Sequence, residues 1–92
     1  MSEADIQRQI IEFLKLRGGI VFRMNAGRGR QNQHLCPVGT PDLLAVLPHA
    51  TFWVEVKDMK GKVTDEQEAM HKRLRDCGHN VIIARSIDDI EH

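Results

Sequence analysis

The sequence predicts an α/β fold with the element order αβββαβ, in which a mixed four-stranded sheet packs against flanking helices. Two amphipathic helical patterns, near residues 3–17 and 64–77, alternate with short apolar runs bounded by glycine, proline and polar residues. From residue 51 to 85 an apolar run, a helix and another apolar run follow one another. That order is typical of two parallel strands joined by a crossover helix.

The first helix is expected from Glu3 to about Arg17, with Ser2 as its N-cap. Its apolar stripe comprises Ile6, Ile10, Phe13 and Leu14. Glu3 precedes Ile6 by three positions, so we expect it on the buried side of the helix. A carboxylate there either approaches a functional site, directly or through a water molecule, or interacts with the helix dipole.

A basic stretch begins near the end of this helix, although the chain as a whole has thirteen basic and thirteen acidic residues. Residues 13–41 include five of the basic residues and none of the acidic ones, so this stretch carries +5 and the remainder −5. The stretch spans a predicted strand at 19–24 and a glycine-rich loop at 25–34. We expect it to lie along DNA phosphates through Arg23, Arg28 and Arg30; the alternative is a mobile, solvated loop.

Two further strands are predicted at 43–47 and 51–57, with Pro48-His49 as the turn between them. If the loop consists of these two residues, the antiparallel pairing places Asp42 opposite Glu55. Directly opposed side chains have Cβ atoms about 4.5–5.5 Å apart on one face of a sheet. Alternation places Lys57 on that same face, and a slip of one residue would move Glu55 to the other face.

Opposed carboxylates destabilise a sheet unless they are compensated, so Asp42 and Glu55 suggest a divalent metal site. Mg²⁺ is commonly held by one or two carboxylates together with water and phosphate oxygens. Such an ion can activate water for phosphodiester hydrolysis, and Lys57 is placed to orient or deprotonate that water. The alternative is an amphipathic strand with Glu55 and Lys57 facing solvent. The preceding turn, Gly39-Thr40-Pro41, favours the catalytic interpretation.

The second helix begins with a capping-box pattern, in which Thr64 is the N-cap and Gln67 the third helical residue. Gln67 also lies on the apolar stripe of this helix, so it either closes the cap or points toward the carboxylates. In the connection before the helix, Lys60 and Lys62 either contact DNA or are simply solvated. After the helix, a strand is expected at 81–84, and Ser86 is a candidate cap for a short terminal helix.

Length and composition predict one domain over residues 1–92. Because no long apolar segment or leader pattern is visible, we expect no membrane span and a cytoplasmic location. Cys36 and Cys77 fit a reducing compartment better than a disulfide scaffold. With His34 and His79 they contain a possible Cys₂His₂ zinc set, but the one-residue spacings differ from those of structural zinc sites.

Three motifs occur in a characteristic order: Gly39-Thr40-Pro41-Asp42, then Glu55-Val56-Lys57, then Gln67 in the next helix. With Glu3 in the first helical turn, this order resembles the PD-(D/E)xK nuclease superfamily, and most closely its virus-type replication-repair nuclease (VRR-NUC) branch. The resemblance spans nearly the whole chain and implies a restriction-endonuclease-like core.

The same resemblance implies DNA hydrolysis dependent on Mg²⁺ or Mn²⁺. Asp42 and Glu55 would be metal ligands, Val56 would lend its backbone carbonyl, and Lys57 would serve the attacking water. For small members of this branch it further implies a homodimer that cuts branched DNA such as four-way (Holliday) junctions. The alternatives are the same chemistry on other DNA ends, flaps or RNA, and a non-catalytic DNA-binding module.

Overall fold

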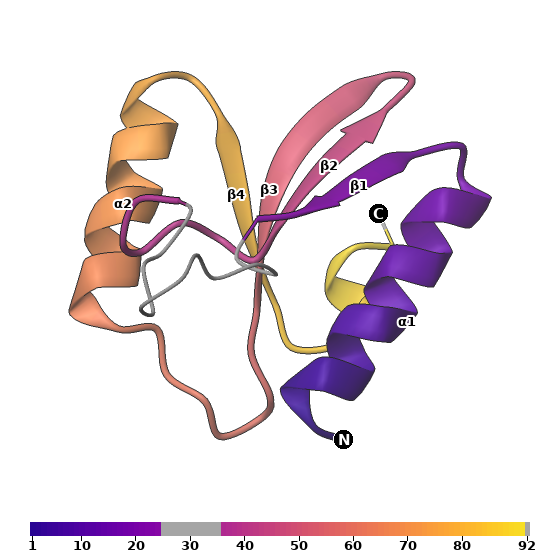
Figure 1. The fold of residues 1–92 in the computed structure, drawn as a ribbon, viewed down its shortest axis with the longest axis horizontal. Helices are drawn as coiled ribbons and strands as arrows, with labels where there is room; N and C mark the ends of the chain where they lie inside the picture. The colour runs from indigo at the N-terminus through magenta and orange to yellow at the C-terminus, as the bar shows by residue number, and fades with distance from the viewer. Residues whose placement is uncertain (25–35, 92) are drawn as a thin grey trace.

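The computed structural model describes residues 1–24 and 36–91, which form a sheet with helices on both sides (Figure 1). In chain order the elements are α1 (Glu3–Leu16), β1 (Ile20–Arg23), β2 (Leu43–Leu47), β3 (Ala50–Val56), α2 (Asp65–Asp76) and β4 (Asn80–Ala84). A 3-10 turn at Ile87–Asp89 follows β4. The predicted α/β class and the order αβββαβ are confirmed. The predicted loop at 25–34 lies outside the described residues.

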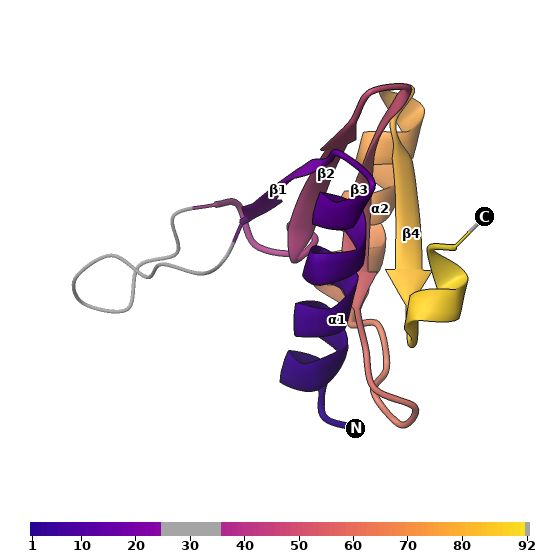
Figure 2. The same ribbon diagram turned by 90° about the vertical axis from the view of Figure 1, so that its right-hand side faces the viewer.

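The sheet has the strand order β1-β2-β3-β4, with β1, β2 and β3 antiparallel and β4 parallel to β3 (Figure 2). Leu43 pairs with Val54 and Leu47 with Ala50, which is the predicted hairpin register. The next pair outward on this ladder is Asp42 and Glu55. Because α2 connects the parallel strands, the end of β3 that carries Glu55 lies beside the beginning of that helix.

The apolar core lies between α1 and one face of the sheet. Its buried members are Ile6, Ile10, Leu14, Leu43, Ala45, Val54, Val56, Ala84 and Ile90. Ser2 caps α1 as predicted, since its Oγ accepts a hydrogen bond from the backbone N–H of Asp5. Ser86, by contrast, makes no side-chain cap bond to the terminal turn. Among the described residues, neither α1 nor α2 has the length and apolar composition of a membrane-spanning segment.

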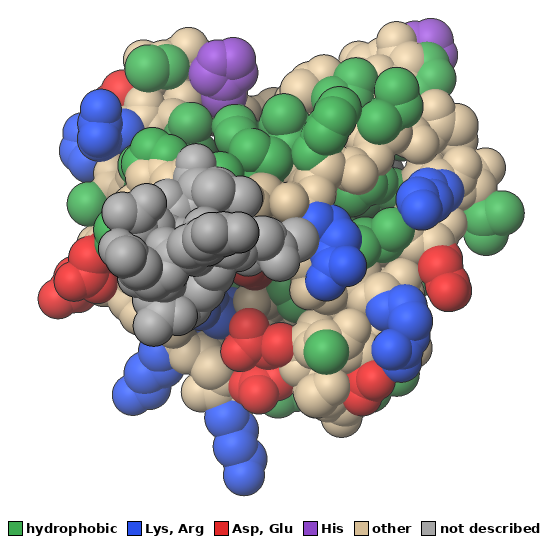
Figure 3. Space-filling view, viewed as in Figure 1, with side chains coloured by type: hydrophobic (Ala, Val, Ile, Leu, Met, Phe, Trp, Pro, Cys, Tyr) green, Lys and Arg blue, Asp and Glu red, His purple; other side chains and the backbone are tan. Residues whose placement is uncertain are grey.

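The opposite face of the sheet is only partly covered. Helix α2 packs against β4 there and buries one residue, His71. On the β1 side, Ile20 is 60% exposed and Phe22 is 50% exposed. Figure 3 shows hydrophobic side chains gathered over the strands between α2 and the β2–β3 hairpin. An apolar strip of the sheet therefore remains accessible.

The turn that leads into Asp42 packs tightly against α2. Gly39 has φ +88°, and a Cβ at this position would fall against the backbone carbonyl of Glu66. Thr40 closes the turn, because its Oγ1 donates to the carbonyl of Pro37 at 2.6 Å. Glycine therefore suits position 39 for two reasons: it adopts a left-handed conformation readily, and it lets the turn approach the backbone of α2 closely.

We expect Gly39→Ala to destabilise the domain more than Gly78→Ala. Gly78 has a nearly equal φ, +90°, but no atom within 4 Å of an added Cβ, so its substitution costs only the conformational strain. That strain is about 1–2 kcal/mol, whereas Gly39→Ala adds an overpacking cost of about 1–3 kcal/mol. Urea unfolding of the two variants measures the difference. Equal losses would show that the turn is not packed as described.

Candidate active site

Asp42 is fixed from both neighbouring strands. Its backbone carbonyl accepts a hydrogen bond from the N–H of Met24, just beyond β1, at 2.9 Å. Its side-chain Oδ2 accepts from the backbone N–H of Val56 on β3 at 2.8 Å. One carboxylate oxygen is thereby engaged and the orientation of the side chain is set, as pre-organised sites require.

Glu55 is a buried carboxylic acid at the end of β3, with 1% of its surface exposed. Burial raises the pKa of Glu55 to about 9, and the hydrogen bond and negative charge of Asp42 contribute in the same direction. The charge of Glu3 raises this pKa further, whereas that of Lys57 opposes the shift. The ionised form of Glu55 is therefore disfavoured unless a positive charge compensates it.

Lys57 is 8% exposed and follows β3, where its backbone N–H donates to the carbonyl of Ala84 at 3.0 Å. Its positive charge lowers the pKa of Glu55 and also that of His71, so the ammonium group lies within electrostatic reach of both. A buried ammonium beside two carboxyl groups fits the predicted grouping of Asp42, Glu55 and Lys57.

Gln67 performs both of the functions considered from sequence. Its Oε1 accepts from the N–H of Thr64 at 3.0 Å, and its own N–H donates to the Oγ1 of Thr64 at 3.1 Å. Its Nε2 donates to Oε2 of Glu55 over a long 3.5 Å. Because the cap holds the oxygen end of the amide, the nitrogen end is left facing the carboxyl group.

His71 belongs to this group of residues but was missed by the sequence analysis. Its Nε2 lies 3.1 Å from Oε1 of Glu55, and its side chain is 2% exposed. The available signal was its spacing, since residue 71 lies one helical turn after Gln67 on the same side of α2. That signal is weak, because a histidine four residues after a glutamine is common on ordinary helices.

Glu3 is exposed, so the prediction that it lies on the buried side of α1 was wrong. The physical reason is that the first turn of α1 projects beyond the strands instead of packing on them (Figure 1). Its charge nevertheless raises the pKa of Glu55, which places it within electrostatic reach of the carboxyl pair. Glu3 thus borders the group from the solvent side.

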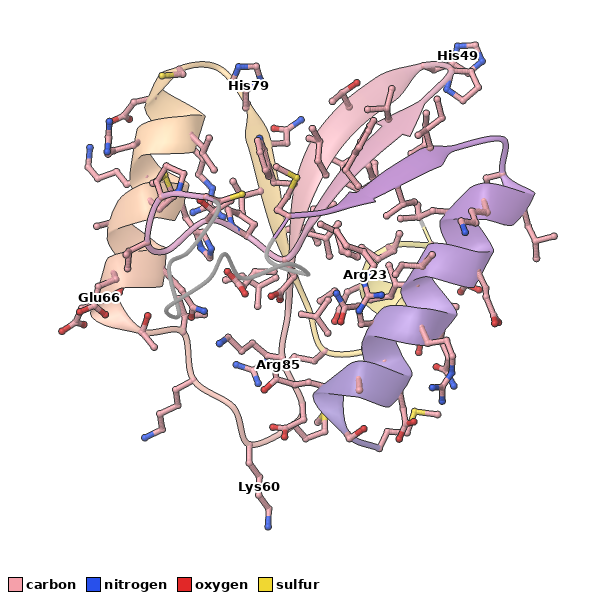
Figure 4. All side chains as sticks on the ribbon, in the orientation of Figure 1. Arg23, His49, Lys60, Glu66, His79 and Arg85 are labelled. Atoms are coloured by element: carbon pink, nitrogen blue, oxygen red, sulfur yellow. The ribbon has the colours of Figure 1, made fainter. Side chains whose placement is uncertain are left out.

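Three of the basic residues predicted to contact DNA fall within the described residues. Arg23, at the end of β1, lines a groove with Arg8 and Lys15 of α1. Lys60 and Lys62 are exposed on the connection after β3, and Figure 4 shows Lys60 extending away from the domain. Arg28 and Arg30 lie outside the described residues.

The connection that carries these lysines is held by hydrogen bonds. Arg85 Nη1 donates to the backbone carbonyl of Asp58 at 2.6 Å and to that of Gly61 at 2.7 Å. The side chain of Asp58 accepts from the N–H groups of Lys60 and Gly61. Neither set of contacts was predicted from sequence. Those of Arg85 depend on how a distant strand end approaches the connection, whereas those of Asp58 are local to it.

Metal-ligating side chains do not otherwise converge. Within residues 1–24 and 36–91, no three His, Cys, Asp or Glu residues are close enough to hold an ion together. Cys36 donates its S–H to the carbonyl of Met24 at 2.9 Å, and Cys77 is exposed. His34 of the considered zinc set falls outside the described residues. Within the described residues, the opposed pair Asp42 and Glu55 therefore has no third His, Cys, Asp or Glu close enough to complete a three-ligand set.

Comparisons with known proteins agree with this geometry. A family model for the VRR-NUC domain matches residues 7–88. A solved structure described as a VRR-NUC domain is 30% identical in sequence, with a TM-score of 0.75 over 97% of this chain and 89% of that one. No curated protein matches significantly. The element order, the carboxyl pair and the family match lead to one conclusion: this chain belongs to the VRR-NUC family of nuclease-type domains.

Proposed function

We propose that this protein is a structure-selective DNA endonuclease that hydrolyses phosphodiester bonds with Mg²⁺ or Mn²⁺. The single observation that carries the proposal is the pairing of Asp42 with the buried carboxyl group of Glu55, with the buried Lys57 beside them. A binding module has no physical need for this arrangement, because burying an acid next to a second acid costs stability.

The donor set fits a hard divalent cation. Two carboxylates and few other protein ligands are what Mg²⁺ sites typically provide, since the ion keeps water molecules and takes up phosphate oxygens of the substrate. Asp42 and Glu55 would hold the ion, together with the carbonyl of Val56 and, directly or through water, Glu3. The bound ion supplies charge stabilisation at the phosphate and a more acidic water molecule.

Lys57 and Gln67 supply the remaining chemistry of the site. The ammonium of Lys57 is placed to orient the attacking water and to offset negative charge that develops on the phosphate. Gln67 is held by its cap with the amide nitrogen toward Glu55, so it stabilises the ionised form of that carboxyl group. Both residues act from fixed positions, which reduces the reorganisation that accompanies reaction.

DNA is the proposed substrate, in keeping with the family match and with exposed basic side chains that could contact phosphates. The proposed contacts are Arg23 at the end of β1 and Lys60 and Lys62 on the connection after β3; Arg28 and Arg30 are proposed contacts outside the described residues. Branched DNA such as a four-way junction is the preferred substrate in this proposal, and linear ends, flaps and RNA are the substrates against which it is compared. Contacts between basic side chains and phosphates fix the position of the DNA backbone and carry no information about base sequence.

A symmetric junction calls for two active sites, so we propose that the protein acts as a homodimer. The exposed apolar strip around Ile20 and Phe22 is the proposed contact surface. Isologous pairing through one such strip would cover it in both copies. It would also protect the unpaired edge of β1 from non-specific strand addition.

We expect Asp42→Asn and Lys57→Ala each to reduce cleavage of a four-way junction by about 100-fold or more while the protein stays folded. Asparagine keeps an acceptor oxygen for the N–H of Val56, so its effect reports the lost charge. Lys72→Ala is the control, because it removes an exposed lysine of α2 that has no proposed contact with metal or DNA and should leave cleavage unchanged. Gel assays with Mg²⁺ and with Mn²⁺, run on junction, flap, linear and RNA substrates, measure the effect.

If neither metal supports cleavage of any substrate while salt-dependent DNA binding persists, the protein is a binding module and the proposal fails. Cleavage of flaps or linear ends in preference to junctions would support the proposed hydrolysis but contradict the proposed substrate.

Metal affinity should rise with pH. The raised pKa of Glu55, about 9, means that the ion must displace a proton at any lower pH. Binding of Mn²⁺ should therefore strengthen by up to about tenfold per pH unit below that value and level off above it. Calorimetry in buffers of different ionisation enthalpy measures the released proton directly. Affinity that does not change with pH would mean that Glu55 is already ionised or is not a ligand.

The substitution Phe22→Asp should convert the dimer to a monomer, because it places an unpaired charge in the proposed contact surface. Leu16→Asp is the control, since Leu16 is 86% exposed at the end of α1 and lies outside the apolar strip. Light scattering after gel filtration gives the mass of each. A parent protein that runs as a monomer, or a Phe22→Asp variant that remains dimeric, would remove this surface from the proposal.

A further inference from the structure

His71 is a polar side chain in a position where an apolar one would be expected. It is the buried residue of α2, and its imidazole is 2% exposed. Burying a polar ring costs free energy unless its nitrogen atoms find partners. The partner of Nε2 is Oε1 of Glu55, at 3.1 Å.

At this distance the contact is a hydrogen bond, and the tautomer of the imidazole decides whether Nε2 donates or accepts. A neutral imidazole has one donor nitrogen and one acceptor nitrogen.

Together with Gln67, His71 holds both oxygens of the same carboxyl group. Gln67 Nε2 donates to Oε2 at 3.5 Å, and His71 Nε2 contacts Oε1. The two residues are one turn apart on α2, so one rigid element fixes the plane of the Glu55 carboxyl group. The shorter of the two contacts is made by His71, which makes it the stronger constraint.

We propose that His71 is a positioning residue for metal binding: its Nε2–H donates to Oε1 of Glu55 and holds that carboxylate in the orientation from which it faces Asp42. This inference rests on the proposed function, because it concerns how the proposed metal ligand is held. Once Glu55 binds an ion as a carboxylate it has no proton to share, so Nε2 must be the donor. Partners of metal ligands typically change metal affinity about 10- to 100-fold when removed.

The competing explanation is that His71 only fills space under α2. In that case any side chain of similar volume should serve, and an apolar one would serve better, because it carries no cost of burying a polar group. The two explanations differ in what they predict for side chains that match the histidine in size but not in the position of the donor.

The experiment measures Mn²⁺ affinity by electron paramagnetic resonance for the parent protein, His71→Gln, His71→Asn and Asp42→Asn. The amide nitrogen of glutamine is as many bonds from Cα as Nε2 of histidine, whereas that of asparagine corresponds to Nδ1 and does not reach Oε1. We expect His71→Gln to bind Mn²⁺ within about threefold of the parent and His71→Asn to bind about 10- to 100-fold more weakly. Thermal unfolding verifies that both variants are folded.

Equal affinity of the asparagine and glutamine variants overturns the role of His71. Loss of binding in both overturns it as well, because the donor of glutamine should rescue the contact. If the parent and Asp42→Asn bind Mn²⁺ equally, the proposed metal site fails, which is a separate outcome.

A measurement on the parent protein covers the case in which the variants do not fold. Nitrogen-15 chemical shifts of the His71 ring, recorded with saturating Mg²⁺, report which nitrogen carries the proton. The proposal requires the Nε2–H tautomer, and finding the proton on Nδ1 alone would overturn it.

Discussion

The contact of Asp42 with the buried acid Glu55 is the constraint on which the rest of the site depends. Such a pair is unfavourable by itself, since Glu55 loses water and meets the negative charge of Asp42. The chain offsets this cost with groups from several elements: the N–H of Val56 on β3, the side chains of Gln67 and His71 on α2, and the ammonium of Lys57. Each of these groups also limits how the acids can move.

The two faces of the sheet divide stability and chemistry between them. On the α1 face, aliphatic side chains pack in a continuous core, and this helix contributes three buried residues. On the α2 face, the helix buries only His71, and polar contacts attach it to the sheet. Arg75, for example, donates to the carbonyl of Val81 at 2.9 Å. The position of α2 therefore depends on the orientation of the Glu55 carboxyl group, because the same contacts that orient this group also attach the helix.

The parts of the fold that were predictable depend on local rules. The hairpin register followed from a two-residue turn, and it brought Asp42 and Glu55 together because a strand alternates strictly. Gln67 was recognised from a capping pattern that is local in sequence. His71 was not, since its partner is sixteen residues away and the helix rotation that joins them is set by packing. The exposure of Glu3 was mispredicted because the periodicity of a helix does not reveal where the sheet beneath it ends.

The way His71 is used also bears on which ions the site would accept. A histidine next to two carboxylates has the composition of a zinc site, and zinc binds imidazole nitrogen readily. In the proposed role of His71, however, Nε2 donates to Oε1 of Glu55, and a nitrogen that donates a hydrogen bond has no lone pair to offer. The proposed ligands are then oxygen atoms alone, from Asp42, Glu55 and the backbone. A small set of hard oxygen donors favours an ion that retains much of its water, as Mg²⁺ does. The retained water leaves positions at which a phosphate oxygen can coordinate the ion.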